Sequence, residues 1–141
     1  MGKTKYDVYK KFDVVLANFG DNNPGVEAGL RPGVIISCNQ SNHSGAPQVC
    51  VVPLSTKLKK IPVHVILNPM DVRGRKLSYK SDFIPECTQT LAKSSIKNRT
   101  GYIPRNSEIR EKIDRALIAH FDLLDVARKM IEEEAHNEQI N

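Results

Sequence analysis

Apolar residues in the first two thirds of this chain gather into short runs separated by polar turns, a pattern typical of β-strands. The runs that predict strands span residues 12–19, 33–38, 49–52, 63–67 and 81–90. The run from 33 to 38 is continuously apolar, which indicates burial on both faces. Pro85 interrupts the last run and makes it the weakest prediction.

The period of the pattern changes after Pro104, where a helix is predicted. Ser107 is a suitable N-cap residue, and Glu108 suits the first turn of a helix. Apolar residues then recur three and four positions apart, at Ile109, Ile113, Leu117, Phe121 and Leu124. A weaker continuation passes through Ala127, Met130 and Ile131, so we expect residues 125–141 to form an acidic helical extension that frays.

Several short strands with a terminal helix predict an α+β protein that is mostly β, built on a small and strongly bent sheet or barrel. Long crossover helices are missing from the pattern, which argues against a parallel sheet. A chain of 141 residues is expected to be one domain. We place that domain at residues 1–124, with 1–10 as an N-terminal arm.

Composition narrows the class of protein. No apolar run approaches the roughly 20 residues that cross a membrane, and the basic N-terminus leads into no apolar signal segment. We therefore expect a cytoplasmic protein with no membrane partner. The three cysteines and four histidines are dispersed without metal-ligand spacing, so no metal site and no cofactor are predicted.

The charge of the chain is unevenly distributed. Of the net charge of +5, residues 125–141 contribute −3, which leaves +8 on residues 1–124. Between Lys57 and Arg99 ten basic residues face three acidic ones. Such a cluster is either a solvated face or a surface that binds a polyanion such as nucleic acid.

The segment Gly25-Val26-Glu27-Ala28-Gly29-Leu30-Arg31-Pro32 places one arginine in a glycine-bounded loop at the mouth of a buried strand. Glycines allow tight turns and close approach to a ligand, and the guanidinium of Arg31 presents a fork of donors that fits a phosphate. Pro32 suits the first residue of a strand. Arg31 is therefore a candidate phosphate-binding residue, with a surface ion pair as the alternative.

Further motifs follow this loop in order. They are Val52-Pro53-Leu54-Ser55-Thr56, Pro62-Val63-His64-Val65, Glu86-Cys87-Thr88-Gln89-Thr90-Leu91-Ala92 and Gly101-Tyr102-Ile103. Over residues 11–124 the chain resembles the MazF/PemK/Kid toxins of type II toxin–antitoxin systems. The resemblance implies an SH3-like barrel of the CcdB/MazF kind. It also implies a metal-independent endoribonuclease (an mRNA interferase) that cuts single-stranded RNA at a short sequence, acts as a homodimer and is blocked by a cognate antitoxin.

The resemblance also implies roles for individual residues. Arg31 occupies the family's catalytic arginine position, and Ser55 occupies the position of its catalytic threonine, with Thr56 next in the chain. RNA can be cut without a metal when its own 2′-hydroxyl attacks the adjacent phosphate, and such a reaction needs positive charge and hydroxyl donors at the phosphate. Strand register decides whether Ser55 or Thr56 faces the site.

Other positions are candidates for RNA contact. Glu86 is either a proton acceptor or a reader of a base edge, with a strand-edge charge as the alternative. Glu27 is expected to orient Arg31 or to line a base pocket, and Phe19 either stacks on a base or belongs to the core. The remaining candidate RNA contacts are Asn23, Gly25, Lys57 and Cys87.

Departures from the family pattern leave other functions open. Phe12 stands where a glycine is usual, and Val26 and Ala28 replace the usual Ser and Gln of the arginine loop. We expect altered sequence preference rather than lost activity. The alternatives are a non-catalytic RNA- or protein-binding module of the same fold and a gyrase poison of the CcdB type.

Overall fold

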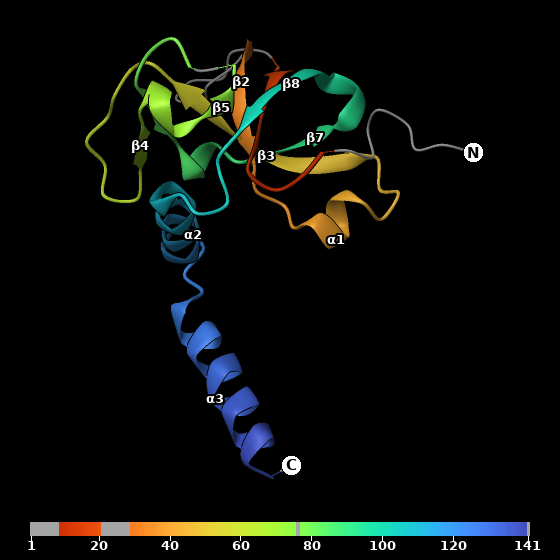
Figure 1. The fold of residues 1–141 in the computed structure, drawn as a ribbon, viewed down its shortest axis with the longest axis vertical. Coiled ribbons are helices and arrows are strands. Elements are labelled where there is room, and N and C mark those ends of the chain that lie inside the picture. The colour runs from red at the N-terminus through yellow and green to blue at the C-terminus, as the bar shows by residue number, and fades with distance from the viewer. Residues whose placement is uncertain (1–8, 21–28, 76, 141) are drawn as a thin grey trace.

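The computed structural model describes residues 9–20, 29–75 and 77–140, so Asn23, Gly25 and Glu27 lie outside the described residues. A curled antiparallel sheet forms the body, and two helices follow it at the C-terminal end (Figure 1). The strands are β1 (Asp13–Asn18), β2 (Leu30–Ile35), β3 (Gln48–Ser55), β4 (Val65–Leu67), β5 (Arg73–Gly74), β6 (Ser81–Phe83), β7 (Gln89–Ala92) and β8 (Ile96–Tyr102). Their order is β4-β6-β3-β2-β1-β8-β5, with β7 paired to β3, and this arrangement confirms the predicted mostly-β barrel with C-terminal helices.

The helical elements are one-turn segments within the sheet and two longer helices after it. They are α1 (Asn39–Asn42), η2 (Pro69–Asp71), η3 (Pro85–Cys87), η4 (Lys93–Ser95), α2 (Glu108–His120) and α3 (Leu124–Ile140). The short helix η3 begins at Pro85, the residue that interrupts the last predicted strand.

The curl of the sheet depends on β3, which changes partner along its length. One edge of the strand pairs with β2 from Val51 to Pro53, while the other edge pairs with β7 from Gln48 to Val51 and then with β6 at Leu54 and Ser55. Pro53 lies between the β7 and β6 segments and has no N–H to donate to a continuous ladder. The end of β3 is therefore turned towards β6 and β4, where the candidate site lies.

Two apolar clusters fill the two faces of the sheet, because neighbouring strand residues point to opposite sides. Val14 and Val34 belong to the first cluster, which α2 covers with Ile109 and Ile113. Val15 and Ile35 belong to the second cluster on the other face. The second apolar run is thus buried on both faces as predicted, although its strand spans Leu30–Ile35 and not 33–38.

Helix α2 begins as predicted, because the Ser107 hydroxyl accepts a hydrogen bond from the backbone N–H of Ile109 at 3.1 Å. The predicted apolar stripe is too long, however. The helix ends at His120, and Asp122 in the following turn has a φ of 55°. Phe121 and Leu124 are therefore exposed and do not continue the face that packs on the sheet.

The acidic extension forms helix α3, which projects away from the barrel (Figure 1). Among the residues that the structure describes, no helix is both long enough and apolar enough to cross a membrane.

Candidate active site

Arg31 and Ser55 lie at the same end of the β2–β3 pair. Gly33 and Pro53 are partners in this antiparallel pair; Arg31 lies two residues before Gly33, and Ser55 lies two residues after Pro53. Both residues therefore reach the same end of the strand pair and the same face. The ladder between β2 and β3 ends just before this point, at Gly33 and Pro53.

Ser55 is also the partner of Asp82 on β6, so the row continues across the sheet. Residues directly opposite each other in an antiparallel pair share a face. Arg31, Ser55 and Asp82 are far apart in the sequence, but the sheet aligns them on the face of the second apolar cluster.

The two neighbouring hydroxyl residues differ in exposure. Ser55 is 4% exposed, and its Oγ accepts a hydrogen bond from the backbone N–H of Lys57 at 3.1 Å. Thr56 and Lys57 follow the end of β3 and are exposed. Ser55 thus fixes the turn out of the strand, whereas the hydroxyl of Thr56 is accessible to a ligand.

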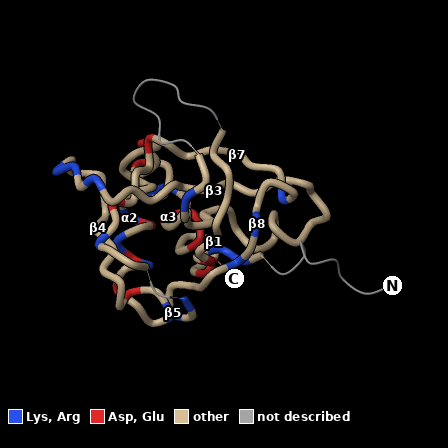
Figure 2. The backbone as a smooth tube through the Cα atoms, turned by 90° about the horizontal axis from the view of Figure 1, so that it is seen from above, with Lys and Arg blue, Asp and Glu red and all other residues tan. Residues whose placement is uncertain are grey.

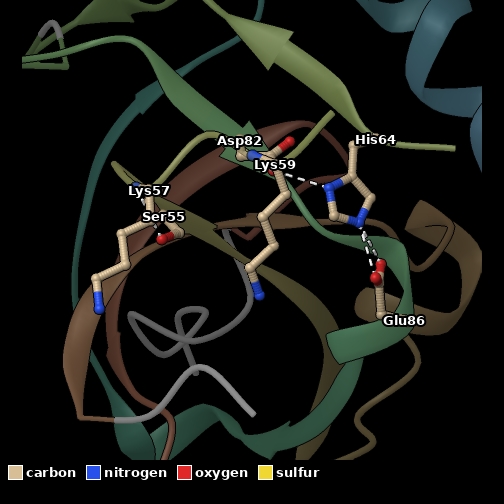
Figure 3. Close-up of polar contacts among 6 residues, drawn as sticks. All are labelled: Ser55, Lys57, Lys59, His64, Asp82 and Glu86. Carbon is tan, nitrogen blue, oxygen red and sulfur yellow. Dashed lines mark hydrogen bonds and ion pairs between the residues drawn. The ribbon is translucent and has the colours of Figure 1, made fainter. Parts of the chain in front are cut away.

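An imidazole bridges two carboxylates beside this turn (Figure 3). The Nδ1 atom of His64 lies 2.7 Å from Oδ2 of Asp82, and its Nε2 atom lies 2.7 and 2.8 Å from the two carboxylate oxygens of Glu86. The side chains of His64 and Asp82 are buried at 1% and 0% exposure, whereas that of Glu86 is 41% exposed. The bridge therefore connects the protein interior to the surface.

The bridge shifts the protonation of its members. Burial lowers the pKa of His64, but hydrogen bonds to Glu86 and Asp82, with the charges of both carboxylates, outweigh this effect and raise the pKa above its ordinary value. Burial raises the pKa of Glu86, but the hydrogen bond from His64, a backbone hydrogen bond and the charges of His64 and His120 bring it below its ordinary value. Both directions favour the charged forms of His64 and Glu86.

Asp82 also holds the basic loop between β3 and β4. Its Oδ2 atom accepts a hydrogen bond from the backbone N–H of Lys59 at 3.1 Å, while its Oδ1 atom is buried without a hydrogen-bond partner among the described residues. The side chains of Lys57, Lys59 and Lys60 are exposed. Figure 2 shows Lys and Arg positions on the projecting loop next to β4, and Figure 3 shows the Lys57 and Lys59 side chains extending from it.

Two of the predicted RNA contacts are buried. Phe19 is 4% exposed and belongs to the second apolar cluster, where it lies over Gly33, whose missing Cβ would come 2.7 Å from the ring. The core alternative for Phe19 is therefore correct, and its ring does not stack on a base in this structure. Cys87 is also buried on η3, so its side chain is not offered to a ligand.

Sequence reasoning missed His64 and Asp82 as members of the site. It placed His64 within a strand, but β4 begins one residue later, at Val65. A signal for Asp82 is present, because a charged residue interrupts the apolar segment Ser81-Asp82-Phe83-Ile84. Within the described parts of the chain, no group of His, Cys, Asp and Glu side chains is arranged to hold a metal ion.

The family of PemK-like, MazF-like toxins of type II toxin–antitoxin systems has a model that matches residues 10–121. No curated protein matches the chain.

Several solved structures share the fold. MazF from Deinococcus radiodurans superposes with a TM-score of 0.66 at 16% identity, over 82% of this chain and 98% of that one. A mycobacterial endoribonuclease in complex with its cognate antitoxin gives 0.62 at 22% identity, over 82% and 97%. The Mycobacterium tuberculosis toxin MazF-mt6 gives 0.62 at 18% identity, over 79% and 97%.

Proposed function

Because the chain belongs to the family of PemK-like, MazF-like toxins of type II toxin–antitoxin systems, we propose that it is a metal-independent, sequence-specific endoribonuclease that cuts single-stranded RNA in the cytoplasm. The observation that supports this proposal is the pairing of Gly33 with Pro53, since Arg31 lies two residues before Gly33 and Ser55 two residues after Pro53, at the same end of the two strands. Structurally similar proteins bear the name endoribonuclease, which agrees with it.

The reaction we propose uses groups of the RNA and of the protein, together with water. The 2′-hydroxyl gives its proton to water and its oxygen attacks the adjacent phosphorus, the bond between phosphorus and the 5′-oxygen breaks, and the 5′-oxygen takes up a proton from water. The products are a 2′,3′-cyclic phosphate and a 5′-hydroxyl. Negative charge grows on the phosphate oxygens during the attack, and fixed donors aimed at those oxygens lower the barrier.

Arg31 supplies that charge in our assignment. Its guanidinium remains protonated at every pH of interest, and its planar fork of donors fits two phosphate oxygens. Thr56 donates its exposed hydroxyl to the phosphate, and buried Ser55 holds the turn that presents Thr56 and Lys57. Lys57 and the basic loop attract the RNA backbone.

Glu86 is assigned as the acceptor of a hydrogen bond from the RNA. Its lowered pKa makes it a weak general base near neutral pH, because an efficient base has a pKa close to the working pH. The same lowered pKa keeps its carboxylate ionised to accept an N–H from a base edge. If Glu86 acted as the base, the cleavage rate would fall in acid as Glu86 became protonated.

Partners follow from the same family membership. We propose that a cognate antitoxin covers this surface and that the active form is a homodimer. One structural neighbour, the mycobacterial endoribonuclease, was solved in complex with its cognate antitoxin, which agrees with an antitoxin partner for this chain.

The decisive experiment incubates the purified protein with long single-stranded RNA in the presence of EDTA and maps the ends of the fragments. We expect cuts at a short sequence that leave a 5′-hydroxyl and a cyclic phosphate. Intact RNA, or cutting that EDTA abolishes, would overturn the proposed reaction. A non-catalytic module would bind the RNA without cutting it.

Matched variants test the assignment of residues. Arg31→Ala should lower the cleavage rate by about 10²–10³-fold, as expected for loss of a group that stabilises developing charge. Arg128→Ala, which removes an exposed arginine from α3, is the control and should leave the rate unchanged. Thr56→Ala should reduce the rate with little change in stability, whereas Ser55→Ala should lower both; the reverse pattern would exchange their roles.

A further inference from the structure

The roles assigned at the phosphate leave two members of the bridge, Asp82 and His64, without a function. We propose that Asp82 and a doubly protonated His64 are positioning residues of the RNA site, which hold the Glu86 carboxylate and the basic loop around Lys59 in the geometry that receives RNA. This proposal rests on the proposed RNA-cutting function and names two further residues that the reaction requires.

The contact between His64 and Glu86 favours one assignment of the protons. Both oxygens of Glu86 lie at nearly the same distance, 2.7 and 2.8 Å, from Nε2 of His64. A protonated carboxyl group would direct only its hydroxyl oxygen at a bare nitrogen, whereas a carboxylate can share one N–H between two oxygens. The geometry therefore fits a Glu86 carboxylate that faces a protonated Nε2 of His64.

The buried side of the bridge points the same way. Asp82 is fully buried, its Oδ1 atom has no hydrogen-bond partner among the described residues, and its Oδ2 atom lies 2.7 Å from Nδ1 of His64. A carboxylate in such surroundings needs a nearby positive charge, because an unpaired buried charge is very unfavourable. The imidazolium supplies that charge at the shortest contact Asp82 makes.

The groups that face the bridge from the neighbouring elements include further cations. Lys112 and Arg115 of α2 line the same cleft as His64, and the charge of His120 acts on Glu86. These cations oppose the protonation of His64, whereas Asp82 and Glu86 favour it at hydrogen-bond distance. The two direct carboxylate contacts dominate because the attraction between charges falls with distance.

Loss of one proton from His64 would affect Glu86 and the basic loop around Lys59 together. A neutral imidazole keeps only one N–H, so either Asp82 or Glu86 faces a bare nitrogen. Oδ2 of Asp82 also accepts the N–H of Lys59, so rearrangement of Asp82 moves the basic loop as well. His64 itself is 1% exposed and does not reach the RNA; it acts through Glu86 and Lys59.

The first test measures the protonation directly. In the full-length protein labelled with ¹⁵N-histidine, NMR should show both ring nitrogens of His64 protonated at pH 7 and a titration above the ordinary histidine value. Glu86→Gln changes an exposed group and should lower the pKa of His64 without unfolding the protein. A neutral His64 at pH 6–7, or an unchanged titration in this variant, overturns the proposal.

The second test measures function against pH. With single-stranded RNA as substrate, His64→Gln should lower kcat by about tenfold or more, in the range seen when groups that orient a site are removed. The wild type should lose activity at alkaline pH as His64 loses its proton, and this limb should be absent in His64→Gln. An alkaline limb that is identical in the two proteins overturns the positioning role.

Two controls separate this proposal from the others. His136→Gln, an exposed change on α3, should match the wild type in rate and pH profile. The Asp82→Asn and His64→Gln variants should bind a 2′-O-methyl RNA, which cannot be cut, more weakly than the wild-type protein does at a pH where wild-type His64 is charged. Equal binding contradicts the positioning role. If wild-type protein cuts no RNA, the proposed function fails, and the NMR and binding measurements still decide whether Asp82 and His64 position the site.

Discussion

Two buried aspartates, Asp13 and Asp82, use the same interactions for different purposes. Each has an exposed fraction of 2% or less, accepts a backbone N–H, and lies beside a cationic side chain. Asp13 accepts from Lys10 N–H at 2.8 Å and pairs with Nε of Arg99 at 3.1 Å. Asp82 accepts from Lys59 N–H at 3.1 Å and pairs with Nδ1 of His64 at 2.7 Å.

The difference lies in the partner. Arg99 keeps its charge at all relevant pH values, and the backbone contact of Asp13 is local, three residues back in the chain. His64 can lose its charge, it extends from Asp82 to an exposed carboxylate, and the backbone contact of Asp82 spans 23 residues. A buried carboxylate whose partner is permanently charged stabilises a fixed turn, whereas one whose partner can lose its charge can connect the interior to a surface site.

The largest expected effect comes from removing Asp82. Asp82→Ala leaves His64 and the Lys59 N–H without their buried acceptor, and loss of one partner of a buried charged pair typically costs about 3–5 kcal/mol. Urea unfolding at pH 7 measures this change. Asp82→Asn keeps the shape and one acceptor, so its cost should be smaller, about 1–3 kcal/mol. Equal costs would show that loss of the charge accounts for the whole effect, whereas a cost near zero for Asp82→Asn would show that charge is not what Asp82 contributes.

His64→Gln should make stability depend less on pH. Because the folded-state pKa of His64 is raised, its contribution is fully present below the ordinary value of 6.5 and is lost as the pH rises through the folded value. At pH 6 we expect the variant to be less stable by about 1–3 kcal/mol, the range for hydrogen bonds to charged groups. Unfolding curves measured upward from pH 6 should show the difference shrinking; a constant difference would contradict the charged bridge.

Asp13→Asn should have a smaller effect and a different pH dependence. Burial raises the pKa of Asp13 despite the hydrogen bond from Lys10 and the charge of Arg99. The contribution of a carboxyl group with a raised pKa is present below the ordinary value of 3.8 and is lost as the pH rises through the folded value. The variant should therefore gain stability relative to the wild type over that rise and lie within about 1 kcal/mol of it at pH 7. A large loss at pH 7 would make the Arg99 pair as important as the His64 bridge.

Local signals in the sequence were sufficient for much of the fold. Ser107 and the spacing of Ile109 and Ile113 identified α2, because capping and the 3.6-residue period depend only on neighbours in the chain. The polar strand β8 was missed because Lys97, Asn98 and Arg99 are exposed and show no apolar alternation. Its position is fixed by backbone pairing with β1, which side-chain patterns do not report.

Only part of the candidate site could be predicted, because sequence patterns report neighbours in the chain and not contacts between distant segments. Arg31, Ser55 and Glu86 were found through motifs that resemble a family, but the bridge joins His64 to residues 18 and 22 positions away. That meeting depends on the pairing of β6 with both β3 and β4, which no local pattern encodes. The phenylalanine at position 12 is explained only by the structure. Phe12 has a positive φ of 73°, which is unusual for this residue type. Its buried ring packs in the first apolar cluster beneath the guanidinium of Arg110.

The smallest effect is expected where a charged pair is exposed. Glu111 and Arg115 lie four residues apart on α2 at 3.3 Å, and both side chains are largely in solvent. Exposed pairs of this kind contribute little, because water screens the charges and the side chains lose freedom. Glu111→Gln should change the free energy of unfolding by about 0.5 kcal/mol or less, and added salt should remove even that difference. A larger change that salt removes would show that the distance between opposite charges, and not burial, determines how much these pairs contribute, and the contrast between Asp82 and Asp13 would then need another cause. A change that salt does not affect would show that Glu111 acts other than through its charge.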